Sequence, residues 1–115
     1  MKTIEYSEVS RQKITDLRQY LTEEFGDKTS KKIVRKLLDT IDNLSLNEKM
    51  GVSVADALGI DSDYRYLVAV HNYVFYRIEE SSIVIVNIFN DREDFMYQLF
   101  GIKTISDDTM DYWGE

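Results

Sequence analysis

Apolar positions follow two different spacings along this chain. In the first half they recur every three or four residues, which predicts helices, and in the second half they form dense β-rich runs. The first helix is expected to follow Ser7, a favoured N-cap residue, and to end near Phe25, before Gly26. Its apolar stripe is Ile14, Leu17 and Leu21, and its expected outward side chains are Arg11, Lys13, Asp16, Arg18 and Gln19.

A second helix is predicted from about Lys28 to Leu44, with an apolar stripe at Ile33, Leu37, Ile41 and Leu44. Only Gly26 and Asp27 separate the two helices, so they form a helical hairpin. A short strand, Thr3–Tyr6, precedes the hairpin and turns Ile4 and Tyr6 to the same side.

Three further strands are expected at Tyr66–Val70, Tyr73–Ile78 and Ile83–Phe89, because β-branched and aromatic residues fill them. The breaks at His71-Asn72 and Glu79–Ser82 are too short for crossover connections. The strands must therefore pair with their sequence neighbours as an antiparallel meander.

Two segments flank the meander. Before it, Ser45–Asp63 loses periodicity and reads as a loop, with one helical turn near Val54–Leu58. After it, a short helix is predicted from about Glu93 to Phe100. The expected order is β-α-α-β-β-β-α, an α+β fold in which the helical hairpin packs on a mainly antiparallel sheet. Residues 1–103 form one domain, and residues 104–115 form an acidic C-terminal tail.

The amino-acid composition excludes several kinds of functional site and several classes of protein. The chain has no cysteine and one histidine, His71, so thiolate metal sites are excluded, and neither a metal nor a cofactor is expected. No apolar run is long enough to cross a bilayer, and a cytoplasmic protein with no membrane contact is expected. The net charge of −7 excludes a globally basic nucleic-acid binder. A local basic face remains possible, because five basic residues cluster at Lys28, Lys31, Lys32, Arg35 and Lys36.

Three arginines on or after the predicted strands are the candidate functional residues. Arg65, Arg77 and Arg92, gathered at one end of the sheet, would be able to bind phosphate or stack on bases. The alternative is that they pair with carboxylates such as Glu79 or Asp94. The neighbouring tyrosines, including Tyr76, are expected to be half-buried with their hydroxyls at the surface.

The order of these motifs resembles a known family. Arg65-Tyr66-Leu67 opens one strand, Tyr76-Arg77 ends the next, and Asn90-Asp91-Arg92-Glu93-Asp94 follows the last. Together with the helical hairpin, this pattern resembles the RelE/ParE toxins of bacterial type II toxin–antitoxin modules, also called plasmid stabilisation proteins, over roughly residues 2–100. The resemblance implies growth arrest, either by cutting mRNA on the ribosome or by poisoning DNA gyrase, and a cognate antitoxin as partner.

The match to the RNA-cutting branch is incomplete. Only Arg65, Arg92 and Tyr97 match its functional groups, whereas Leu67 and Tyr73 stand where that branch has cations. The resemblance therefore favours a ParE-like action on DNA gyrase or on an unassigned target, with Arg65, Arg77 and Arg92 as target-binding residues. Two alternatives remain open. One is a ribosome-dependent mRNA endoribonuclease with Arg65, Arg92 and Tyr97 as catalytic residues, and the other is a non-toxic interaction module with the same fold.

Overall fold

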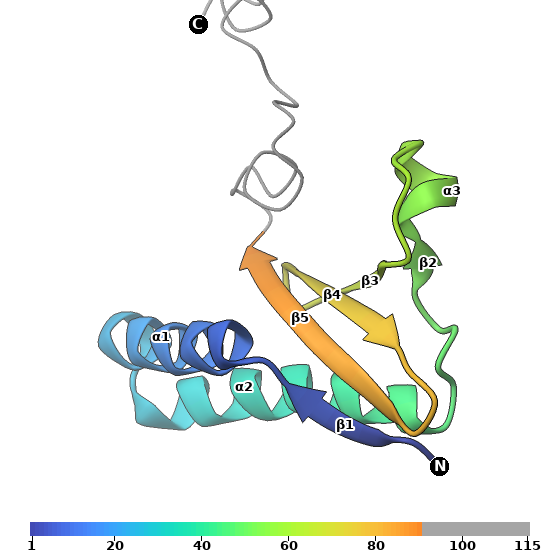
Figure 1. The fold of residues 1–115 in the computed structure, drawn as a ribbon. Coiled ribbons are helices and arrows are strands. Elements are labelled where there is room, and N and C mark those ends of the chain that lie inside the picture. The colour runs from blue at the N-terminus through green and yellow to red at the C-terminus, as the bar shows by residue number, and fades with distance from the viewer. Residues whose placement is uncertain (91–115) are drawn as a thin grey trace, which may run out of the picture.

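Residues 1–90, the part of the chain that the computed structural model describes, form a helical hairpin packed on a five-stranded sheet (Figure 1). The helices are α1 (Glu8–Phe25), α2 (Asp27–Asp42), the 3₁₀ turn η1 (Asn43–Ser45) and α3 (Val54–Leu58). The strands are β1 (Thr3–Tyr6), β2 (Val52–Ser53), β3 (Arg65–Ala69), β4 (Asn72–Ile78) and β5 (Ser82–Asn90). The predicted helix at Glu93–Phe100 and the tail at residues 104–115 lie outside the described residues.

The sheet has the order β1-β5-β4-β3-β2. Strands β3, β4 and β5 form the expected antiparallel meander, and β1 joins it in parallel along β5, with Thr3 opposite Ser82 and Tyr6 opposite Ile85. The predicted α+β class, the helical hairpin and the mainly antiparallel sheet are confirmed.

Strand β5 contains a bulge at Val86. Tyr76 of β4 pairs with Ile85 and Phe75 pairs with Asn87, so Val86 is an extra residue on the β5 side. A bulge changes the alternation of side chains by one position. Ile83, Ile85 and Ile88 can therefore all pack in the cluster beneath the helices, while Phe89 packs in a separate cluster on the other face.

The start of α1 is fastened to β5 at this bulge. The Ser7 hydroxyl caps the helix by accepting from the Ser10 amide at 3.0 Å. It also lies 2.8 Å from the Val86 carbonyl, while the buried Ser10 hydroxyl lies 2.9 Å from the Ile85 carbonyl. The backbone of Ser7 also donates to Ile85 at 3.0 Å. These bonds satisfy carbonyls at the irregular part of the strand and fix α1 to it.

Each face of the sheet has its own apolar cluster. The larger cluster lies between the sheet and α1 and α2, and its fully buried members include Leu37, Ile41 and Tyr76. The smaller cluster lies on the opposite face, where Val54 of α3 packs with Phe75 and Phe89. The rings of Phe75 and Phe89 meet edge to face at 5.9 Å between centroids.

Several details differ from the sequence-based expectations. The segment expected as a loop from Ser45 to Asp63 contains the two-residue strand β2, although the helical turn at Val54–Leu58 is confirmed as α3. The break between β3 and β4 is Val70-His71, whereas Asn72 belongs to β4. Lys13 was expected to face outward but is half-buried against β5, because its ammonium donates to the Ile88 carbonyl at 2.9 Å.

Candidate functional site

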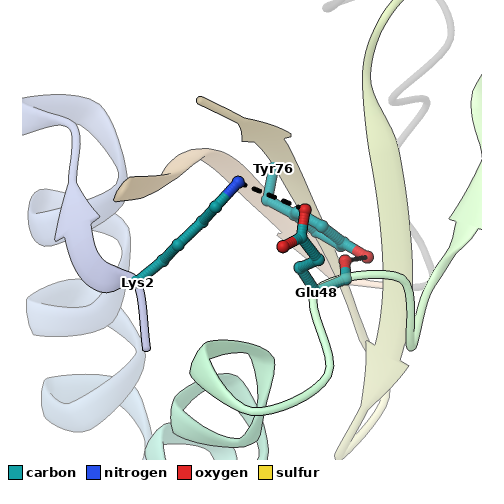
Figure 2. A network of polar contacts seen from close by, with 3 residues as sticks. All are labelled: Lys2, Glu48 and Tyr76. Carbon is teal, nitrogen blue, oxygen red and sulfur yellow. Dashed lines mark hydrogen bonds and ion pairs between the residues drawn. The ribbon is translucent and has the colours of Figure 1, made fainter. Parts of the chain in front are cut away.

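Tyr76 holds the loop between η1 and β2 from inside the core. Its side chain is fully buried, contrary to the expected surface hydroxyl. The hydroxyl donates to the Glu48 carbonyl at 2.9 Å and accepts from the Gly51 amide at 3.0 Å. Figure 2 shows that the Glu48 side chain extends this network to the first residues of the chain, through an ion pair with the Lys2 ammonium at 3.3 Å. The burial of the tyrosine is thus made possible by two loop groups that satisfy its hydroxyl.

Gly51 is needed where this loop meets β3. A Cβ at this position would lie against the backbone carbonyl of Tyr66 and 2.8 Å from the Tyr76 hydroxyl. Neither obstacle is the free end of a flexible side chain, because one is backbone and the other is held in the core. The loop reaches β3 this closely only because position 51 has no side chain.

Arg65 is bound to the same loop. Its guanidinium donates to the Gly51 carbonyl at 2.7 Å and to the Lys49 carbonyl at 3.4 Å. Its Nε is buried and has no hydrogen-bond partner among the described residues. Tyr76 and Arg65 lie opposite each other in the sheet, so these two side chains clamp the Glu48–Gly51 loop from neighbouring strands.

Arg77 points to the other face of the sheet. Arg65 is paired with Tyr76, so the next residue of β4 faces away from the side that Arg65 occupies. The Arg77 guanidinium binds the Glu79 carboxylate, with Nε and Nη2 at 2.9 and 2.8 Å from the same oxygen. This is the carboxylate pairing that the sequence left open. Arg65 and Arg77 are therefore close along the sheet but do not share one surface.

Arg92 and Tyr97 lie outside the described residues. The last described residue, Asn90, pairs with Asn72 at the end of the sheet that carries the Val70-His71 turn. Arg77 is five positions along β4 from Asn72, which corresponds to roughly 17 Å of strand. The described chain thus ends at some distance from the two arginines on β3 and β4.

Two ionisable groups have clearly shifted pKa values. Burial, and then the nearby Asp42 carboxylate, raise the pKa of Tyr6 to about 12. The hydrogen bond that the Arg77 guanidinium donates to Glu79 is the main reason that the pKa of Arg77 is raised. Both shifts move away from neutral pH, so neither side chain can serve there as a proton acceptor.

A groove of about 990 Å³ lies at the sheet end where β5 finishes. Residues from α1, α2, the Val70-His71 turn and the end of β5 line it. Lys13 of α1 is one of the lining residues, and its ammonium lies 4.1 Å from the centre of the Phe89 ring. The position of Lys13 on the helix is compatible with full exposure, so its contact with Phe89 could not be predicted from the sequence.

Residues 1–90 hold no group of three or more histidine, cysteine or carboxylate side chains placed to bind a metal ion. Within the same residues, neither long helix is apolar enough to cross a membrane.

Comparison with known proteins identifies the family. Residues 4–95 match the model of the family described as the ParE toxin of the type II toxin–antitoxin system parDE. The chain belongs to the ParE toxin family. A search of curated proteins found no match. Among solved structures, a chain of the chromosomal ParDE toxin–antitoxin system from P. aeruginosa has a similar fold, with a TM-score of 0.66 and 13% sequence identity. The alignment covers 78% of this ParE chain and 96% of that chain.

We expect Gly51→Ala to lower the free energy of unfolding by roughly 2–3 kcal/mol, because the added methyl group overpacks a site bounded by backbone. Gly59→Asn is the matched control. Gly59 has a φ of 70° and open space around it, and asparagine tolerates this conformation, so the change should be about 0.5 kcal/mol or less. Urea denaturation of both variants measures the difference, and equal losses would contradict the close approach at Gly51.

Proposed function

We propose that this ParE-family protein arrests growth by binding DNA gyrase, or another large target, and that a cognate antitoxin neutralises it. The observation that carries the proposal is the position of Arg65. This arginine is the one described residue among the three that resemble an RNA-cutting site, and its guanidinium is engaged by the Gly51 and Lys49 carbonyls. A guanidinium held in this way binds the carbonyls of the loop, which favours a structural role over binding of a phosphate.

RNA cleavage would require a base for the 2′-hydroxyl and cations beside the developing charge on phosphorus. Strands β3, β4 and β5 carry only two cationic side chains, Arg65 and Arg77, and these leave the sheet on opposite faces. Such an arrangement supports binding in preference to cleavage.

The face opposite the two long helices has the features of a binding surface. Val68 is 58% exposed there, beside Tyr66 and Tyr73, whose ring centroids are 5.9 Å apart. Arg77 lies on this face with 37% of its side chain exposed. Aromatic residues and arginine commonly supply most of the energy of protein interfaces. We assign target contact to this face and to Arg77, and extend the assignment to Arg92. Arg65 contributes to the same function by holding the loop.

The edge of the sheet at β3 is a suitable binding site for the antitoxin. Strand β2 pairs only with Arg65 and Tyr66, so the rest of β3, residues 67–69, has no partner on that side among the described strands. An extended antitoxin segment is able to add a strand at such an edge. Because the chain has a net charge of −7, this segment is expected to carry basic contacts.

Induced expression of the protein alone should arrest bacterial growth, and co-expression of the adjacent antitoxin gene should relieve the arrest. The measurement is colony count after induction, with soluble protein verified by immunoblot. Undiminished growth at verified soluble expression would reject a toxic function and favour an interaction module with the same fold.

Arg77→Ala should weaken target affinity about tenfold, or about 1.4 kcal/mol. Its unfolding free energy should change by about 0.5 kcal/mol or less, because an exposed ion pair stabilises little. Arg35→Ala, on the exposed side of α2, is the matched control and should change neither property.

Arg65→Ala should instead lower the free energy of unfolding by about 1–2 kcal/mol, through loss of its contacts with the loop carbonyls. Growth inhibition over a range of inducer concentrations, together with urea denaturation, separates these effects. Full toxicity of Arg77→Ala would remove Arg77 from the target surface.

A further inference from the structure

The groove at the end of the sheet is bordered by large apolar side chains that the described residues leave exposed. Tyr20 and Phe25, on the last turns of α1, are 55% and 60% exposed and stand at its rim. Leu17, Ile33 and Ile88 line its interior. Aromatic side chains around a hollow of this size are typical of a surface that another segment covers.

One wall of the groove is a turn in an unfavourable conformation. Val70 and His71 have φ angles of 44° and 65°, in the left-handed region that hairpin turns of this type normally fill with asparagine or glycine. A β-branched residue is rare there and costs conformational energy. The Asn72 side-chain amide supports the turn by donating to the Val70 carbonyl at 2.8 Å. Glycine at position 70 would avoid this conformational cost. The contribution of the Val70 side chain to the groove lining offers a reason why valine occupies the position.

The chain itself supplies the segment that fits. Asn90, the last described residue, lines the groove, so the following residues start at its edge. Their sequence places Phe95, Met96, Leu99 and Phe100 at the spacing of one helical face. We propose that residues 93–100 of this chain dock in the groove between α1 and the Val70-His71 turn, with their apolar face against Tyr20 and Phe25.

The length of the connecting chain supports this occupant. Phe95 is five positions beyond Asn90 in the sequence, and an extended chain of five residues spans up to about 17 Å. The docked segment places Arg92 at the mouth of the groove, at the opposite end of β4 from Arg77. The inference rests on the groove and the sequence, and is independent of any toxic activity.

The test uses disulfide formation in the full-length chain, which has no cysteine of its own. Leu99→Cys is combined with Tyr20→Cys, with Phe25→Cys or with Val9→Cys. Val9 is the matched control, because it is 51% exposed on the same helix but does not line the groove. Position 99 is nine residues beyond Asn90, so an unattached segment of up to about 30 Å reaches Val9 as well. After mild oxidation, intramolecular disulfides are quantified by mass spectrometry of the monomer.

Docking predicts at least tenfold more disulfide with Tyr20→Cys or Phe25→Cys than with Val9→Cys. Equal yields at the three positions, or none at the groove positions, would overturn the proposal. Disulfide-linked dimers that form selectively at the groove would also overturn it, because the occupant would then be a second copy.

Thiol labelling gives a second measurement. Adding Leu99→Asp to the single Tyr20→Cys variant should speed maleimide reaction at least threefold and leave that of Val9→Cys unchanged. An unchanged rate at Tyr20→Cys would contradict docking.

Discussion

The β-bulge at Val86 determines which way the side chains on the second half of β5 face. With strict alternation after Ile83 and Ile85, Phe89 would point toward the helices and Ile88 away from them. The extra residue reverses this, so Ile88 joins the core beneath α1 and Phe89 meets Phe75 and α3. The hydroxyls of Ser7 and Ser10 bind the carbonyls at this irregularity, and so the start of α1 and the twist of the sheet are determined together.

A second constraint acts at the other end of the strands. Buried Tyr76 and partly buried Arg65 both bind backbone groups of the Glu48–Gly51 loop, which in turn leads into β2. A buried hydroxyl or guanidinium without partners destabilises a fold, so the loop and the two side chains depend on one another. The consequence for function is direct. An arginine that resembles a catalytic cation in the sequence has a structural role in the fold. The other arginine of the described strands, Arg77, is partly exposed and lies on the opposite face.

The sequence predicted the larger elements well because their signals are local. Helical spacing marked α1 and α2, and short breaks between β-rich runs required the antiparallel meander that the structure confirms. Strand β2 has only two residues and no periodicity to detect. The burial of Tyr76 and the engagement of Arg65 could not be predicted, because both depend on a loop far away in the sequence that approaches through Gly51. The partial burial of Lys13 likewise depends on a carbonyl of β5, seventy-five residues further along the chain. The roles of Arg92 and Tyr97 remain predictions from the family resemblance.

We propose that this ParE-family protein acts by binding DNA gyrase or another large target, and not by cutting RNA. The most direct measurement compares the purified protein in two assays at the same concentrations: supercoiling of relaxed plasmid by DNA gyrase, and cleavage of mRNA on programmed ribosomes. Binding of gyrase predicts inhibition of supercoiling that Arg77→Ala weakens and Arg35→Ala does not, with intact mRNA throughout. Cleavage of mRNA on the ribosome that Arg65→Ala abolishes, in protein that is still folded, would contradict it.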